Sequence, residues 1–194
     1  MSSDILKDII MNKEEEFQNS KVTEIIKDNP SILKDYPLLE VEYNIDGSKK
    51  SLSSLASEKD IKETQLKSDE NELDYKYSQN KISKEEYDKL KEELDKKLYN
   101  QNLVYDDLIF DIIDKSDIED IKKEIKDANL NDIALNRLAS SLSSIAENKI
   151  KEFQENNKNF RVEKLSYWNY KYTSIAKSYE KTREIESYIL SLIK

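Results

Sequence analysis

Apolar positions recur every three or four residues over most of the chain after residue 54, a spacing that places them on one face of a helix. The clearest stripe covers residues 135–153 and includes alanines that allow a neighbour to approach closely. Similar stripes predict a helix from Ser83 to about Ile113 and a last helix over residues 160–193, after a turn at residues 154–159. The pattern predicts a mainly α fold.

The segment YSQNKISKEEYDKL, residues 77–90, marks the end of one charged helix and the start of the next. The first helix stops at Asn80. Ser83 and Glu86 have the spacing of a capping box, in which the serine hydroxyl accepts from the third amide and the glutamate reaches back. Two helices joined by so short a turn predict an antiparallel helical hairpin over residues 54–115.

The predicted hairpin is highly charged and has a thin apolar seam. Residues 58–97 contain ten lysines and thirteen acidic residues. Because a sparse seam of coiled-coil type buries little area, we expect the hairpin to need a partner surface or self-association. The candidate interface residues along this seam are Leu66, Leu73, Tyr77, Tyr87, Leu90 and Leu94.

The segment NKISKEEYDKLKEEL, residues 80–94, resembles short helical hairpins found in bacterial oligomerisation modules and in phage structural proteins. The usual glycine of their turn is replaced here by Asn80 and Lys81, and the resemblance covers this segment alone. It implies a role in assembly. The residues that carry it are Ile82, Ser83, Glu85, Glu86, Tyr87 and Leu94.

A different period is found at residues 39–45, where Leu39, Val41, Tyr43 and Ile45 alternate with polar residues. Period two is typical of a half-buried strand. Asp46-Gly47 is a hairpin-turn signal, and residues 48–52 could return as a second strand. We therefore expect a small β-ribbon near residues 39–52.

These elements predict three regions. Residues 1–53 form N-terminal helices and the ribbon, with Asn29-Pro30 starting a helical turn that Pro37 closes. Residues 54–115 form the hairpin, and residues 116–194 form a C-terminal helical region that packs with the N-terminal part. Ser116 and Asn131 are the expected helix caps in that last region. The predicted whole is an elongated helical bundle.

The composition favours long helices and lacks the side chains that most catalytic mechanisms use. One glycine and two prolines leave few residues for sheets and tight loops, and 37% apolar against 38% charged residues favours one apolar stripe per helix. There is no cysteine and no histidine, which excludes thiol nucleophiles, disulfides and the commonest general base. No nucleotide-binding, hydrolase or metalloprotease motif occurs. We expect a protein that is not an enzyme and needs no cofactor.

The net charge of −9 argues against general affinity for nucleic acid or anionic membranes, because like charges repel. The start MSSDILKD has no apolar region of a signal peptide, and no apolar run is long enough to span a membrane. The expected location is the cytoplasm, or a virion if the protein comes from a phage. Abundant lysine, asparagine, isoleucine and tyrosine are typical of an AT-rich genome.

An acidic stretch at residues 105–120 invites a calcium hypothesis. An EF-hand loop that starts at Asp114 would place Ile118 at a ligand position, and the required glycine is missing. Capping and the helix dipole explain the acidic residues without a metal, so we expect no metal site.

An aromatic run at residues 165–172 allows three interpretations. Leu165, Trp168 and Tyr172 follow the predicted buried stripe, whereas Tyr167 and Tyr170 point elsewhere and are candidates for a protein interface. Nearby lysines would also suit stacking on a single nucleic-acid strand, although the net charge opposes this.

The leading hypothesis is a non-enzymatic structural protein that acts through helical interfaces with protein subunits, either copies of itself or other structural proteins. A bacteriophage virion, scaffold or capsid-associated component is one concrete form. The alternative is a small acidic cytoplasmic binding module or regulator, such as an inhibitor that mimics nucleic acid. A single-strand binder using the aromatic run is a third hypothesis.

Overall fold

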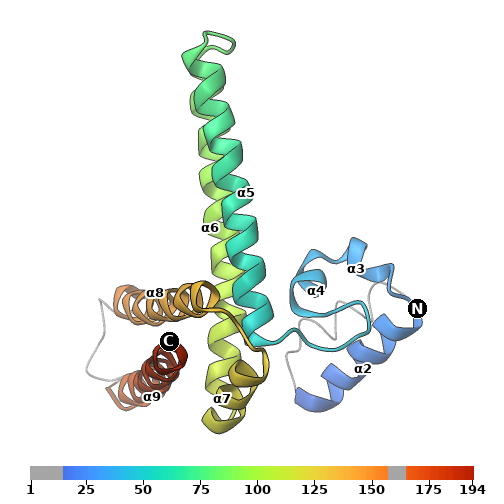
Figure 1. The fold of residues 1–194 in the computed structure, drawn as a ribbon, viewed down its shortest axis with the longest axis vertical. Helices are drawn as coiled ribbons and strands as arrows, with labels where there is room; N and C mark the ends of the chain where they lie inside the picture. Colours follow the sequence, from blue (N-terminus) through green and yellow to red (C-terminus); the bar gives the residue numbers. More distant parts are fainter. Residues whose placement is uncertain (1–14, 157–164) are drawn as a thin grey trace. The chain divides into compact units, whose positions relative to one another are not determined.

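The computed structural model describes residues 15–156 and 165–194, with side chains for residues 21–153, 155 and 177–194. In these ranges every regular element is a helix, so the expected mainly α fold is confirmed (Figure 1). The chain divides into two compact units, which meet in sequence between Ser51 and Leu52. The helices are α2 (Glu15–Asp28), α3 (Ile32–Asp35), α4 (Pro37–Glu42), α5 (Leu52–Ser78), α6 (Lys84–Lys115), α7 (Ile118–Asp127), α8 (Asp132–Asn156) and α9 (Leu165–Leu192). Residues 1–14 of the region expected to form N-terminal helices lie outside the described residues.

The first unit encloses a small apolar core of its own. α2 supplies its buried face through Val22 and Ile26, which are one helical turn apart. Leu33 of α3, Leu39 of α4 and Tyr43 complete the core. α3 ends at Asp35 just before Pro37, as expected, and Pro37 itself occupies the first turn of α4, where its missing amide hydrogen is not needed.

The predicted β-ribbon is wrong. Residues 37–42 form α4, and the only β pairing in the described ranges is an isolated antiparallel bridge between Tyr43 and Lys49. Leu39 and Tyr43 are four residues apart, so the alternating pattern also fits one face of a helical turn. The burial follows that spacing: Leu39 and Tyr43 are each 3% exposed, whereas Ile45 is 73% exposed.

Gly47 makes the turn after α4 possible. Its φ of 84° lies in the left-handed region, and its amide donates to the carbonyl of Asn44 at 3.0 Å. The carboxylate of Asp46 accepts a hydrogen bond from the amide of Ser48 at 2.9 Å, which fixes the residue after the glycine. A Cβ atom at position 47 would lie 2.5 Å from the carbonyl oxygen of Thr23 in α2, so only glycine fits.

In the second unit α5 and α6 pack side by side, and α8 packs on α9 (Figure 1). α7 is a short amphipathic helix that buries one face and contacts α9. The expected cap at Ser116 is wrong: Ser116 ends α6, and Asp117 caps α7 by accepting from the amide of Glu119 at 2.8 Å. Asn131 does cap α8, accepting from Ala134 at 2.9 Å. The buried side chains of this core include Leu55, Tyr105, Ile109, Ile113, Ile125, Leu142, Ile145, Ile185 and Ile189.

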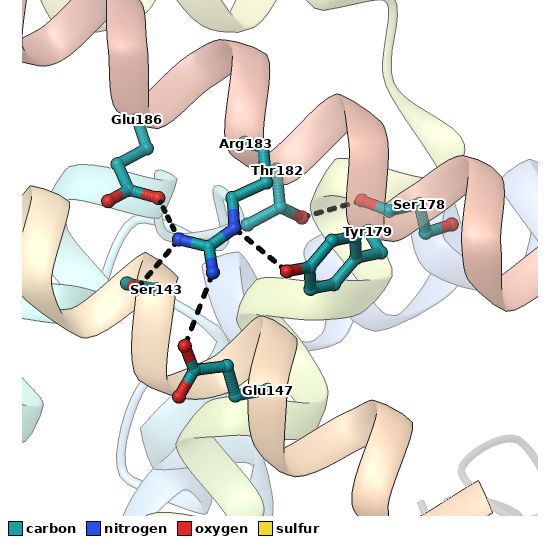
Figure 2. A network of polar contacts seen from close by, with 7 residues as sticks. All are labelled: Ser143, Glu147, Ser178, Tyr179, Thr182, Arg183 and Glu186. Atoms are coloured by element: carbon teal, nitrogen blue, oxygen red, sulfur yellow. Dashed lines mark hydrogen bonds and ion pairs between the residues drawn. The ribbon is translucent and has the colours of Figure 1, made fainter.

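Polar contacts hold α9 in register. Figure 2 shows Arg183 reaching from α9 to α8, where its guanidinium donates to Ser143 at 2.9 Å and pairs with Glu147 at 3.2 Å. On α9 itself the same guanidinium donates to Glu186 and Tyr179. These bonds use the directed donors of arginine to fix how α8 and α9 slide against each other.

Candidate interaction surface at the hairpin tip

The hairpin tip, defined here as residues 70–91, is built on an ordered turn between α5 and α6. Asn80 adopts the left-handed conformation with φ of 55°. The amide of Asn80 donates to the carbonyl of Tyr77 at 3.0 Å, and that of Lys81 donates to Lys76 at 3.0 Å. These are the two bonds of a Schellman motif, which satisfies the last carbonyls of α5. Asparagine therefore takes the place that glycine usually has.

The start of α6 is fixed by a second local device. Ser83 is extended, and its hydroxyl accepts a hydrogen bond from the amide of Glu86 at 3.1 Å. Glu85 and Glu86 also place negative charge at the positive end of the helix dipole. Both helix ends at the tip are thus closed by short-range bonds.

Aromatic and polar contacts join the two helices at the tip. The rings of Tyr77 and Tyr87 stack with their centroids 4.4 Å apart and an angle of 19° between planes. The hydroxyl of Tyr87 donates to Asp74 at 2.7 Å, and this bond lowers the pKa of the Asp74 carboxyl. Offset stacking and a charged acceptor both favour one fixed arrangement.

Lys91 adds charge to the same contacts. Its ammonium donates to the Tyr87 hydroxyl at 3.1 Å and pairs with Glu70 at 3.2 Å and Asp74 at 3.5 Å. The bonds to Tyr87 and Glu70 raise the pKa of Lys91. Because these groups face solvent, the pairs are screened and mainly fix geometry.

Two tyrosines remain exposed at this ordered end. The side chain of Tyr75 is 59% exposed and that of Tyr77 is 38% exposed. The Lys81 ammonium lies 5.7 Å from the centroid of the Tyr75 ring. Residues 76–84 contain three lysines and no acidic residue, although the whole chain carries a net charge of −9. Residues 75–84 are therefore aromatic and locally cationic, within a tip that holds six acidic and five basic residues in all.

The candidate residues from the sequence occupy two different environments. Leu73 is buried, and Leu66, Tyr87, Leu90 and Leu94 are half-buried along the hairpin, whereas Tyr77 is exposed. Tyr167 and Tyr170 belong to α9, but their side chains lie outside the described residues.

The sequence pattern did not single out three exposed large side chains of the hairpin. Tyr75 and Tyr99 are 59% and 69% exposed, and Leu103 is 38% exposed. All three lie outside the seam of Leu and Tyr positions from which the candidate interface residues were chosen. The usable signal was an aromatic residue out of phase with the seam of a charged helix.

Neither a group of side chains placed to hold a metal ion nor a helix able to span a membrane is found in the described ranges. Groups of three or more acidic side chains placed to hold a metal ion do not occur there. None of the helices described has the length and apolar character that crossing a bilayer requires.

Comparisons of the chain with models of protein families, with curated proteins and with solved structures found no match.

Proposed function

We propose that this chain is a non-enzymatic assembly protein that binds protein subunits through the tip of its α5–α6 hairpin. One observation carries the proposal: Tyr75 and Tyr77 are exposed in the last turn of α5, next to a connection whose backbone and helix ends are held by local bonds. Tyrosine buries a large area on binding and loses little side-chain entropy, which is why it is enriched in binding hot spots.

The rigidity of the tip strengthens this reading. A Schellman motif, a serine cap and a tyrosine stack each restrict the tip before any partner arrives. Because the tip is ordered before it binds, association costs less conformational entropy. More of the favourable contact free energy then contributes to affinity. Inclusion in a large particle, such as the virion of a bacterial virus, is one form of this role and rests on the local resemblance of residues 80–94.

Light scattering across concentration tests the proposal directly. We expect the purified chain to form oligomers as its concentration rises, and Tyr75→Ser to weaken association about tenfold or more, as loss of a hot-spot aromatic does. Tyr99→Ser is the matched control, because Tyr99 is also exposed on the hairpin but lies about 12 Å beyond the tip at 1.5 Å per helical residue.

The outcomes separate the hypotheses. A monomer at every concentration, with no large particle containing it in its native lysate, would refute an assembly role. If instead the chain binds a single basic protein with affinity that falls steeply with salt, the acidic binding module is favoured. If Tyr75→Ser and Tyr99→Ser weaken association equally, the tip is not the binding surface.

A further inference from the structure

Tyr77 of α5 and Tyr87 of α6 hold their phenol rings face to face. The ring centroids are 4.4 Å apart and the planes differ by 19°. At this separation carbon atoms of the two rings are in van der Waals contact. Because the two residues belong to different helices, a bond between the rings would join α5 to α6 covalently.

The backbone on both sides of the turn keeps the two rings in place. The carbonyl of Tyr77 accepts from the amide of Asn80 at 3.0 Å, and the amide of Tyr87 donates to the carbonyl of Ser83 at 2.9 Å. Holding two reacting groups together replaces a collision between molecules by a unimolecular step. Coupling of these two rings is therefore favoured over coupling to a tyrosine of another molecule.

Tyr87 also has a proton acceptor. Oxidation of a tyrosine by one electron proceeds with loss of the phenolic proton, so a hydrogen-bonded base makes the oxidation easier. The Tyr87 hydroxyl donates to the carboxylate of Asp74 at 2.7 Å. This bond lowers the pKa of the Asp74 carboxyl, which is therefore ionised at neutral pH and can accept the proton. The Asp74 side chain is 45% exposed, so the proton can pass on to water.

Lys91 stabilises the phenoxyl oxygen that the proton leaves. Its ammonium donates to the Tyr87 oxygen at 3.1 Å. The bond does not use the phenolic hydrogen, so it remains when the oxygen has become an acceptor only. Tyr77 is 38% exposed, which lets an oxidant in solution reach the second ring.

We propose that Tyr77 and Tyr87 are a site of oxidative crosslinking, at which two one-electron oxidations form a dityrosine bond across the hairpin tip. Each ring loses one electron and its phenolic proton, and the proton of Tyr87 leaves through Asp74. A carbon–carbon bond then forms between the positions next to the two hydroxyl groups, and the hydrogen on each of these carbons moves to the phenolic oxygen. A peroxide acting in one-electron steps is the class of oxidant required, because hydrogen peroxide takes up both electrons and both protons and becomes two molecules of water. The site does not rest on the proposed assembly role, since both rings belong to one chain.

Illumination of the dilute full chain with a ruthenium trisbipyridyl complex and persulfate tests the site. Persulfate takes up the two electrons and becomes two sulfate ions. Trypsin cleaves after lysine, which places the two rings in separate peptides, residues 77–81 and residues 85–89. We expect these two peptides to be recovered as a linked pair, with a mass equal to their sum less two hydrogen atoms. The yield per chain should stay constant on dilution.

Substitutions assign the roles of the side chains. Tyr77→Phe and Tyr87→Phe are each expected to abolish the linked pair. Asp74→Asn keeps an acceptor for the Tyr87 hydroxyl but removes the base, so crosslinking at neutral pH should slow about tenfold or more. This difference should vanish towards about pH 10, where a phenol ionises without help. Tyr99→Phe is the matched control, because Tyr99 is exposed on the same hairpin and takes no part in the stack.

Three results would overturn the proposal. The first is the absence of the linked pair of residues 77–81 and 85–89 in folded protein, checked by circular dichroism, under conditions that couple free tyrosine. The second is an equal yield, within single chains, of links that contain Tyr75 or Tyr99. The third is an unchanged rate for Asp74→Asn at neutral pH, which would overturn the role of the carboxylate. Self-association would give links between chains whose yield grows with concentration, so failure here is distinguishable from failure of the assembly role.

Discussion

The ion pair between Lys59 and Asp106 joins α5 to α6 inside the second unit, and its removal is expected to be the most informative single perturbation. The two side chains are 11% and 13% exposed, and the ammonium lies 2.7 Å from the carboxylate. Replacing Lys59 by methionine keeps most of the side-chain volume and leaves a buried carboxylate without its cation. We therefore expect Lys59→Met to lower the free energy of unfolding substantially.

The magnitude follows from burial. Breaking a buried pair by removing one partner costs about 3–5 kcal/mol. Asp106 borders a cleft between α5, α6 and α8, where water can partly solvate it, so we expect about 3 kcal/mol at neutral pH. Replacing both partners, in Lys59→Met/Asp106→Leu, leaves no uncompensated charge and should return stability to within about 1 kcal/mol of the parent chain.

The loss should depend on pH with a defined sign. Burial raises the pKa of the Asp106 carboxyl, although the bond to Lys59 and its charge act in the opposite direction. Without Lys59 that pKa rises further. The folded state then takes up a proton at a higher pH than the unfolded chain, so stability increases as pH falls through the raised pKa. The penalty of Lys59→Met is full at neutral pH and shrinks in acid.

Urea unfolding at about pH 7 and in acid, where Asp106 is protonated, measures this difference. The fluorescence of Trp168, the only tryptophan, follows the second unit because it lies in α9. Lys67→Met is the control, because Lys67 is an exposed lysine of the same helix. A penalty that is equal at both pH values, or a double variant as unstable as Lys59→Met, would refute the reasoning.

Three further substitutions probe local devices. Gly47→Ala places a Cβ atom 2.5 Å from a backbone oxygen at a φ of 84°, and we expect a loss of about 2 kcal/mol or more, seen as reduced hydrogen-exchange protection in α2. Ser83→Ala removes the cap of α6 and should cost about 1 kcal/mol in urea unfolding, whereas Ser83→Asp should restore it. Arg183→Met loses its bonds to α8, and because 37% of the side chain is exposed we expect only about 1–2 kcal/mol, with Arg137→Met as the exposed control.

Helix ends in the hairpin could be predicted because local chemistry decides them. The turn at Asn80 and the cap at Ser83 are short-range features, and both are found in the structure. The prediction of a β-ribbon was wrong because the local pattern at residues 39–45 fits two structures. Leu39 and Tyr43 satisfy both a period of two and a helical turn, and only their burial in the core of the first unit decides between them.

Features that join distant parts of the chain were not accessible from the pattern. Lys59 and Asp106 are 47 residues apart, and Arg183 reaches a serine 40 residues away on α8. Periodicity assigns each residue to a face of its own helix but says nothing about which face of another helix it meets. The contacts between the helices of the second unit follow from those meetings, so no sequence signal pointed to them.

The structure changes the physical case for partners at the hairpin. The thin seam of the sequence predicts leucine and tyrosine positions that need a partner for their burial. In the structure Leu73 is buried, and Tyr87 is stacked on Tyr77 and bonded to Asp74. The tip is thus closed by its own contacts. Tyr75 lies outside that closure, so its exposure does not arise from a packing defect, and an exposed ring on an already ordered turn is what a binding surface requires.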